Sequence, residues 1–390
     1  MEDEINFASD TWEIINTYLK QNNSSELIRH HLDSFNDFMD NKISFIIKQF
    51  NPLIVYHEYL PESNSYKYEI HIIYGDIHYG NPMIHENNGS SKLLYPHEAR
   101  ARNMSYSMTL FVDMEIKIIT KEPGLEDKMF TKNLNKINIG KIPIMLRSKY
   151  CLLNNHKAKP EDFDECRYDL GGYFIINGNE KVIVSQEKIA ENKVYAFKTS
   201  KNSRFSHTVE IKSIKDDTYI TPKNISIKLM SKDTLNGKTL KVFIPYIRLE
   251  IPLFVMFRVL GIITDKDIIM HIIGEINENT QKIMEWLRPS VIDAENIRTQ
   301  EEAFNYLSKG MTILGHPKDI KLDKQKKHDY IKNMLNRDFL TQMDNNFRNK
   351  SLFLGYMVNK LAKCYFGEIN YDDRDSYCNK RIETSGNLMA

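Results

Sequence analysis

A chain of 390 residues, of which 41% are hydrophobic and 27% are charged, is long enough for two or three globular domains with a sizeable buried core. Its formal net charge of +1 excludes a globally basic nucleic-acid-binding protein, so any such surface must be local. The four cysteines form no CxxC pair and the apolar runs are short, which argues against a zinc site and against a membrane-spanning helix.

The N-terminal part of the sequence predicts two helices and then a strand. Ser9 and Asp10 can cap a helix whose apolar side chains, Trp12 among them, recur every three or four residues. A second helix repeats this spacing over residues 28–39. From residue 66 to residue 79 apolar and polar residues alternate, which predicts a strand with one buried face.

The central part of the sequence predicts further strands. Residues 104–120 form one long candidate strand and residues 139–146 form another, which Pro143 interrupts, and a charged connector lies between the two. Asn177-Gly178 is a strong hairpin signal because both residues tolerate positive φ. It predicts a hairpin whose strands are residues 173–176 and 182–185.

The C-terminal half predicts a change from strands to helices. Several short strands over 207–247 are followed by a helix after Pro252 and by a mainly helical block to about residue 366. Thr299 and Glu302 match a capping box at the start of one helix. The tail, 371–390, is polar and has no core of its own, so we expect it to pack on an earlier segment or to continue in a longer protein.

No combination of residues in the sequence predicts catalysis. The patterns GxxxxGK[ST], GxGxxG and GxSxG are absent. An acidic run near the C-terminus contains the carboxylates of Asp372, Asp373 and Asp375. These carboxylates could bind Mg²⁺. Alternatively, the run could form a solvated turn, or an ion-pair cluster with its basic neighbours Arg374, Lys380 and Arg381. We therefore assign no catalytic residue and no metal ligand, and expect a binding module or a part of a larger machine.

Three stretches carry a resemblance to a known family. They are "YPHEARARNMSYSMTLFVD" (95–113), then "IGKIPIMLRSKYCLL" with "CRYDLGGYFIINGNEKVIVSQE" (139–187), and finally "LFLGYMVNKLAKC" with "DDRDSYCNKR" (352–381). In this order, the sequence resembles the second-largest subunit of multisubunit DNA-directed RNA polymerases of the eukaryotic and giant-virus type. The resemblance extends over nearly the whole chain.

The resemblance implies an α+β fold in two parts. A mixed α/β protrusion domain would begin the chain at residues 1–195, and a more helical α/β lobe domain would be inserted at residues 196–378. Residues 379–390 would return to the protrusion. The family subunit is about three times longer than this chain.

The resemblance also implies nucleic-acid-binding residues. Lys181 matches a basic position that faces nucleic acid, and Gln186 matches a polar position on the side of the RNA–DNA hybrid. Asp375 and Lys380, with Arg381 beside them, match positions where bacterial relatives contact the displaced DNA strand. The sequence departs from the family at Ser376-Tyr377-Cys378, which replaces His-x-Gly, and a cysteine would be disfavoured if that turn needs positive φ.

The implied function is to form a wall of the DNA cleft in a nucleotidyltransferase that copies DNA into RNA. The implied partners are the largest subunit and other polymerase subunits, the DNA template, the RNA–DNA hybrid and initiation factors. The catalytic Mg²⁺ would be held by another subunit, so no cofactor is expected in this segment. The alternative is a free-standing fragment that binds polymerase or transcription factors without catalysis. A cellular enzyme would lie in the nucleus, and a giant-virus enzyme in the virion or the host cytoplasm.

Overall fold

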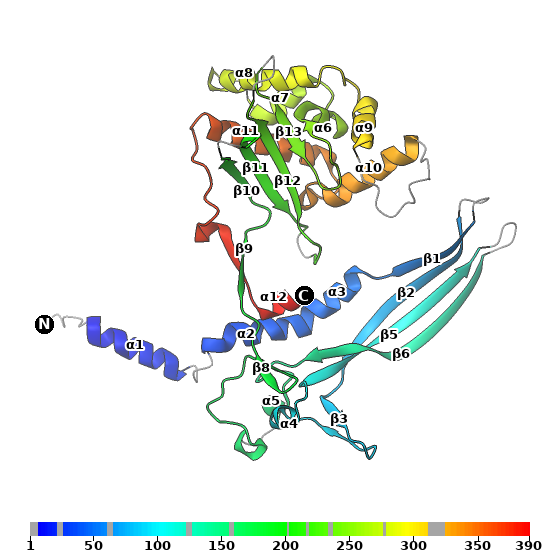
Figure 1. Ribbon diagram of the computed structural model, residues 1–390, viewed down its shortest axis with the longest axis vertical. Helices are drawn as coiled ribbons and strands as arrows, with labels where there is room; N and C mark the ends of the chain where they lie inside the picture. Colours follow the sequence, from blue (N-terminus) through cyan, green and yellow to red (C-terminus); the bar gives the residue numbers. More distant parts are fainter. Residues whose placement is uncertain are drawn as a thin grey trace. The chain divides into compact units, whose positions relative to one another are not determined.

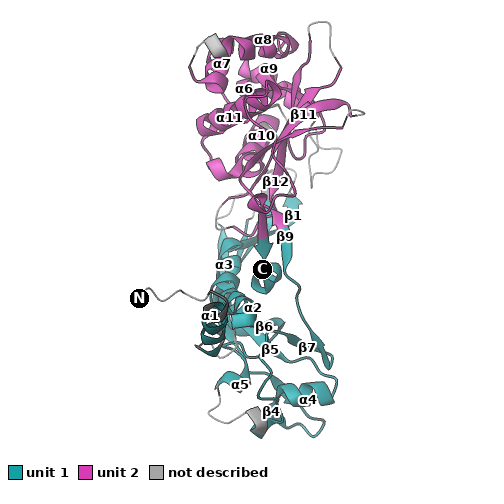
Figure 2. Cartoon of the chain, turned by 90° about the vertical axis from the view of Figure 1, so that its left-hand side faces the viewer, with its two compact units in different colours: residues 1–187, 382–390 teal, residues 188–381 magenta. Residues whose placement is uncertain are grey.

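The computed structural model describes residues 7–21, 26–60, 65–121, 127–155, 160–200, 203–215, 218–232, 237–275, 278–310 and 324–390 (Figure 1). The chain divides into two compact units, which Figure 2 distinguishes by colour: unit 1 comprises residues 1–187 and 382–390, and unit 2 comprises residues 188–381. Unit 2 is therefore an insertion in the chain of unit 1. The segment boundaries expected at 195/196 and 378/379 fall inside unit 2, near its two ends. Helices and mainly antiparallel strands together confirm the α+β class.

Among the described helices, none combines the length and the apolarity that crossing a membrane requires.

Unit 1 combines a helical N-terminal segment with an antiparallel sheet of order β1-β2-β5-β6. Its helical elements are α1 (Phe7–Gln21), α2 (Glu26–Asp37), a π-helical turn (Phe38–Lys42), α3 (Ile43–Gln49), α4 (Pro96–Ala101), α5 (Leu152–Asn155), a 3-10 turn (Pro160–Phe163) and α12 (Ser385–Met389). Its strands are β1 (Leu53–Leu60), β2 (Ser65–Tyr79), β3 (Met83–His85), β4 (Ser91–Leu93), β5 (Ser107–Thr120), β6 (Lys128–Pro143), β7 (Phe174–Ile176) and β8 (Asn179–Lys181). Strands β9 (Gln186–Ile189) and β15 (Lys380–Glu383) pair where the chain passes between the units.

The core of unit 1 lies between the second predicted helix and the first half of β5. Phe35 and Met39 are buried together with Tyr106 and Met108, and the ring of Phe35 packs edge-on against Phe174 at 5.7 Å. The residues that face this core from α2 follow the predicted spacing of three and four, so that prediction is confirmed.

The tail prediction is also confirmed, because α12 packs on α2 within unit 1. The backbone N–H of Gly386 donates to the Ser34 hydroxyl at 2.9 Å. A Cβ atom at Gly386 would overlap the carbonyl oxygen of Ser34, so only glycine permits this approach. The hydroxyls of Ser34 and Thr384 lie 2.6 Å apart.

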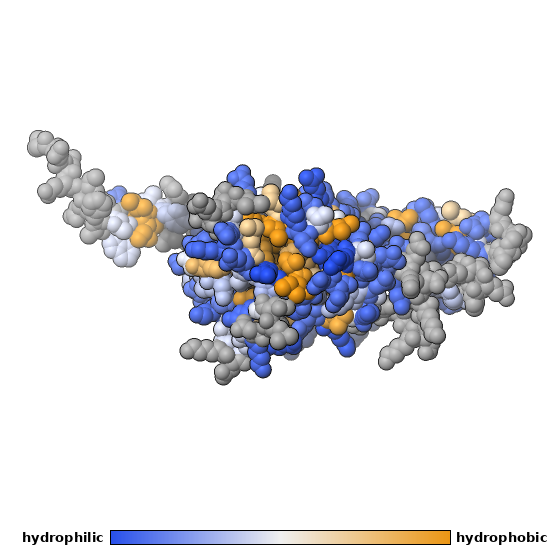
Figure 3. Space-filling model, turned by 90° about the horizontal axis from the view of Figure 1, so that it is seen from above, coloured by the Kyte–Doolittle hydropathy of each residue, from blue (hydrophilic) through white to orange (hydrophobic). Residues whose placement is uncertain are grey.

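The prediction for the start of α1 was wrong. This helix begins at Phe7, so Ser9 and Asp10 lie inside it rather than capping it. Its apolar face is also exposed, with Trp12 at 73% and Ile15 at 43%, and hydrophobic residues of α1 are visible at the left of Figure 3. The apolar spacing predicted the helix correctly, but nothing described in this chain covers that face.

Two strands of the sheet in unit 1 were missed or shortened by the sequence analysis. β1 was not predicted, and β6 begins at Lys128, in what was expected to be a charged connector. Both are the outer strands of the sheet and are exposed over most of their length, so their sequences lack a clear alternation of apolar and polar residues. The end of β6 at Pro143 agrees with the prediction, because proline cannot donate a ladder hydrogen bond.

Unit 2 packs helices against an antiparallel sheet of order β10-β11-β12-β13-β14. The helices lie on one side of the strands in Figure 2. Its strands are β10 (Val194–Lys198), β11 (Phe205–Ser213), β12 (Lys223–Met230), β13 (Leu240–Phe243) and β14 (Ile251–Pro252). Its helical elements are α6 (Leu253–Val259), α7 (Asp265–Ile273), α8 (Glu278–Asp293), α9 (Gln300–Lys309), α10 (Lys324–Asp338), α11 (Phe347–Tyr365) and the 3-10 turns Thr341–Met343 and Tyr377–Asn379.

Local signals in unit 2 were predicted correctly. α6 begins directly after Pro252, and α9 begins with the capping box of Thr299 and Glu302, in which both reciprocal hydrogen bonds are present. On α11, Met357 and Leu361 are fully buried against the sheet and α7.

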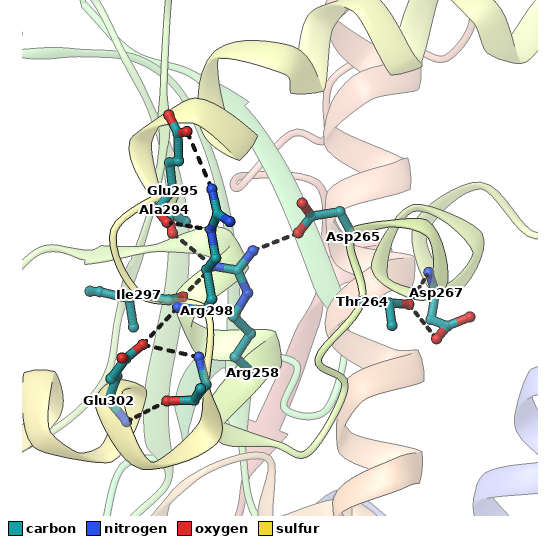
Figure 4. A network of polar contacts seen from close by, with 10 residues as sticks. Arg258, Thr264, Asp265, Asp267, Ala294, Glu295, Ile297, Arg298 and Glu302 are labelled. Atoms are coloured by element: carbon teal, nitrogen blue, oxygen red, sulfur yellow. Dashed lines mark hydrogen bonds and ion pairs between the residues drawn. The ribbon is translucent and has the colours of Figure 1, made fainter.

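A buried arginine of unit 2 joins α6 to the start of α7 and to the connection between α8 and α9 (Figure 4). The guanidinium of Arg258 on α6 donates to the carbonyl oxygens of Ala294 at 2.7 Å and of Ile297, and pairs with Asp265 at 2.6 Å. Arg258 is 3% exposed, whereas Arg298, which pairs with Glu295 in the same region, has a side chain that is 75% exposed. Only the buried arginine is therefore expected to matter for stability.

We expect the substitution Arg258→Met to lower the free energy of unfolding of unit 2 by about 1–3 kcal/mol, because it leaves two buried carbonyls without their donor. Arg298→Met is the matched control and should cost less than about 0.5 kcal/mol, as exposed ion pairs usually do. Urea unfolding of the two variants measures the difference, and equal losses would contradict it.

Candidate nucleic-acid interface

The hairpin that carries Lys181 is built on an Asn-Gly turn. Asn177 has φ 51° and Gly178 has φ 79°, as the two central residues of a type I′ turn require. Strand β8 resumes at Asn179, and Lys181 pairs with Phe174. The prediction of the hairpin is confirmed, but the prediction that its second strand lies at 182–185 was wrong. Those residues follow β8 without belonging to a strand.

The hairpin is fixed to the loop that follows α4. The backbone N–H of Gly178 donates to Met104 O at 3.0 Å, and that of Asn177 donates to the Ser105 hydroxyl at 3.0 Å. A Cβ at Gly178 would lie 2.6 Å from Asn103 Oδ1, so the loop leaves no room for a larger residue. A turn held at this many points fixes the register of the strand that ends at Lys181.

An arginine from α4 holds the hairpin from the other side. The Arg100 guanidinium donates to Glu180 at 2.6 Å, to Glu165 at 2.8 Å and to the Tyr173 hydroxyl at 2.8 Å. Burial alone would lower the pKa of Arg100, but Glu165 and Tyr173 outweigh it and raise that pKa above its ordinary value. Burial and Asp169 raise the pKa of the Tyr173 hydroxyl.

The sequence analysis did not single out Arg100. It lies within the quoted stretch "YPHEARARNM", but its partners are distant in the sequence, and no local pattern connects it to them. The presence of an arginine in a strongly matched stretch was the one available signal.

Lys181 and Gln186 are both exposed in unit 1. Lys181 ends β8 and Gln186 begins β9, so the short segment 182–185 separates them. Val182 and Val184 in this segment are also exposed, at 58% and 75%. The structure thus places these two predicted site residues at the two ends of one short segment, and both side chains are exposed.

Asp375, Lys380 and Arg381 lie in the tail of unit 2. Asp375 is exposed, and its backbone N–H donates to Asp373 Oδ1 at 2.9 Å. Lys380 and Arg381 begin β15, where Lys380 is half-buried and Arg381 is exposed. The tail before them is anchored through Asn379, whose side chain bonds Lys193 Nζ at 2.6 Å and Asp373 O at 2.6 Å.

The departure at Ser376-Tyr377-Cys378 does not strain the backbone. Cys378 lies in a 3-10 turn, Tyr377–Asn379, and none of the three residues has positive φ. The condition under which a cysteine would be disfavoured, a turn that needs positive φ, is therefore not met in this chain.

The acidic run makes structural contacts. The Asp372 carboxylate pairs with Lys360 at 2.8 Å and accepts the backbone N–H of Ala196 at 2.8 Å. The Arg374 guanidinium lies 4.1 Å from the centre of the Phe197 ring and pairs with Glu210 at 2.9 Å. Within the described ranges, no three histidine, cysteine or acidic side chains gather as metal ligands.

Comparisons with known proteins agree with the resemblance seen in the sequence. A family model described as RNA polymerase beta subunit matches residues 26–390. DNA-directed RNA polymerase II subunit 2 of Arabidopsis thaliana is 33% identical over 405 residues, covering 100% of this chain and 33% of the plant protein. DNA-directed RNA polymerase II subunit RPB2 of Eremothecium gossypii is 36% identical over 402 residues, covering 98% of this chain and 32% of the fungal protein. This chain thus spans about a third of the length of these two relatives.

A shorter archaeal protein is matched over more of its length. DNA-directed RNA polymerase subunit Rpo2N of Methanothermobacter thermautotrophicus is 30% identical over 383 residues. That alignment covers 93% of this chain and 68% of the archaeal protein.

Proposed function

The chain belongs to the RNA polymerase beta subunit family, as the N-terminal part of a second-largest subunit, and on this basis we propose that it forms one wall of the DNA cleft in a DNA-directed RNA polymerase. Unit 1 acts as the protrusion and unit 2 as the lobe. The match of the family model to residues 26–390 is the observation that carries this proposal.

The hairpin of unit 1 is proposed to contact the RNA–DNA hybrid. Its support is the exposure of Lys181 and Gln186 on a segment held by Arg100 and by the loop after α4. The backbone that carries this lysine is held in place before binding, so a phosphate contact costs only the rotamer entropy of the side chain. Gln186 adds hydrogen bonding to the same surface.

The tail of unit 2 is proposed to contact the displaced DNA strand through Asp375, Lys380 and Arg381. The support is the position of these residues on an exposed segment whose base is anchored by Asn379. Arginine and lysine suit phosphates, and an aspartate can accept from the amino groups of bases.

The chain is proposed to act only in an assembly. The largest subunit and other polymerase subunits would be its protein partners, initiation factors would dock on it, and the catalytic Mg²⁺ would be held by another subunit. Its own contribution to nucleotidyl transfer is to position the nucleic acid.

Assembly is the first test. Tagged full-length chain is purified from its native source, and its companions are identified by mass spectrometry. We expect the largest polymerase subunit among them. Recovery of the chain alone, or with a transcription factor only, would overturn the subunit proposal and favour a free-standing binding module.

The contact to the hybrid is tested by charge reversal. We expect polymerase that carries Lys181→Glu to form elongation complexes that dissociate about 3–30-fold faster at 0.15 M salt, because a repulsive charge replaces one phosphate contact. The control is Lys48→Glu, a reversal at an exposed position of α3, which should leave the rate unchanged. Equal rates for the two variants would show that Lys181 does not face nucleic acid.

A further inference from the structure

The sheet of unit 1 has an apolar face that is covered over only half of its length. Along β5, every second residue from Met108 to Ile118 is apolar. Met108, Leu110 and Val112 are buried, but burial stops at Met114 although the apolar alternation continues. Side chains two apart on a strand share one face, so the same face passes from the core to an uncovered region.

The uncovered region extends across all four strands. One row of directly paired residues runs Leu53–Ile72–Ile116–Lys132, and the next runs Val55–Ile70–Ile118–Phe130. We call these eight residues the apolar sheet face. None of them belongs to the core of unit 1, and Phe130 is 62% exposed. In Figure 1 the strands run on past α3, the last helix drawn along them.

The opposite face of the same strands is mixed: Glu69, His71 and Lys117 share it with Ile54, Tyr56, Ile119 and Met129. Glu69 pairs there with Lys121 at 2.7 Å and with His71 at 2.9 Å. These contacts lower the pKa of the Glu69 carboxyl, with the Lys121 ammonium as the first cause. Charged side chains therefore interrupt the opposite face, whereas seven of the eight side chains of the apolar sheet face are apolar.

In the two rows of the apolar sheet face and in the row that follows them, the charged side chains are all basic. Lys132 ends one of its rows, and the following row, His57–Tyr68–Thr120–Lys128, ends in a second lysine. No aspartate or glutamate stands in these three rows. A segment that covers this face must therefore be apolar where it contacts the aliphatic side chains and acidic where it lies beside the outer strand β6.

We propose that the apolar sheet face docks another polypeptide of the polymerase assembly, through an amphipathic segment with acidic residues along one flank. This inference rests on the proposed function, because it takes its partner from the assembly. A second copy of this chain fits poorly, since it would bring lysines to lysines. Nucleic acid fits poorly too, since six of the eight side chains are aliphatic and offer neither stacking nor charge to it.

Cysteine labelling tests the proposal with matched positions. Phe130→Cys lies on the apolar sheet face, and Met129→Cys is its neighbour on the opposite face, with 65% exposure in the native residue. Both are made in a background in which the exposed Cys166 and Cys378 are serine. The maleimide reaction is compared between the free chain and the purified assembly.

We expect assembly to slow labelling of Phe130→Cys at least tenfold and labelling of Met129→Cys less than twofold. Co-purification of the largest subunit with unchanged labelling at both positions would overturn this inference and leave the proposed function intact. Failure to co-purify at all would overturn both. Equal slowing at both positions would also overturn the inference, because the cover would not be selective for one face.

The charge of the occupant is tested separately. The double variant Lys128→Glu/Lys132→Glu should lower the recovery of the chain in the assembly at least threefold at 0.15 M salt, and the Lys→Gln pair should have an intermediate effect. Unchanged recovery with the glutamate pair would overturn the acidic flank of the proposed occupant.

Discussion

The substitution Gly355→Ala is expected to lower the free energy of unfolding of unit 2 by about 3 kcal/mol or more. Gly355 lies on α11 where this helix crosses α7. A Cβ there would overlap the carbonyl oxygen of His271 and lie 2.7 Å from its carbonyl carbon. Alanine favours a helix over glycine by only about 1 kcal/mol, which does not offset a clash with backbone.

The measurement follows the fluorescence of Trp286, which packs against the core of unit 2. The chain has two tryptophans, so Trp12→Phe leaves Trp286 as the sole reporter in urea unfolding. Arg348→Ala is the control, because it lies at an exposed position of the same helix, and it should change stability by less than about 0.5 kcal/mol. An equally stable Gly355→Ala variant would mean that α7 and α11 are not in close contact.

The second large effect is expected at Lys350, a fully buried lysine in α11. Its ammonium donates to the carbonyl oxygens of Leu335 at 2.7 Å and Asn336 at 3.2 Å, at the end of α10. Lys350→Ala removes the buried stem and leaves both carbonyls without this donor, so we expect a loss of about 2–4 kcal/mol. Lys350→Met keeps most of the volume and should cost less.

The same lysine predicts a dependence of stability on pH. Burial lowers the pKa of Lys350 to about 8, although Asp344 and Asp338 act in the opposite direction. Between pH 8 and the unfolded value near 10.5 the folded chain binds fewer protons, so stability rises with pH over this window. Relative to Lys350→Met, the native chain should gain about 2–3 kcal/mol there.

The control for this experiment is Lys309→Met, at an exposed lysine of α9. Its stability should follow that of the native chain at every pH, because this variant keeps the buried Lys350. A native chain that parallels Lys350→Met from pH 8 to pH 10.5 would contradict the lowered pKa.

Turn and cap chemistry could be predicted from the sequence because it depends on neighbours in the chain. The Asn177-Gly178 turn and the capping box at Thr299 are examples. The strand after the turn was placed too late because Val182 and Val184 carry the apolar signal, whereas β8 is polar and exposed. In a two-residue hairpin loop the second strand must resume at once, and this rule should have outweighed the apolar pattern.

Contacts between distant segments could not be predicted. Nothing in the sequence near Gly355 indicates that α11 meets α7, and nothing near Arg100 indicates Glu165 and Glu180. The placement of Lys181 on an exposed hairpin follows from the turn, but the support that holds it depends on tertiary packing.

The insertion of unit 2 into the chain of unit 1 has a consequence for synthesis on the ribosome. Residues 188–381 must all emerge between the last strand of the hairpin and the segment 382–390 that completes unit 1. At about 5–20 residues per second this takes roughly ten to forty seconds. During that time the surface of α2 that later receives α12 stays open, while unit 2 already has its whole sheet and can fold. The order of emergence therefore favours an inserted unit that is finished before its host.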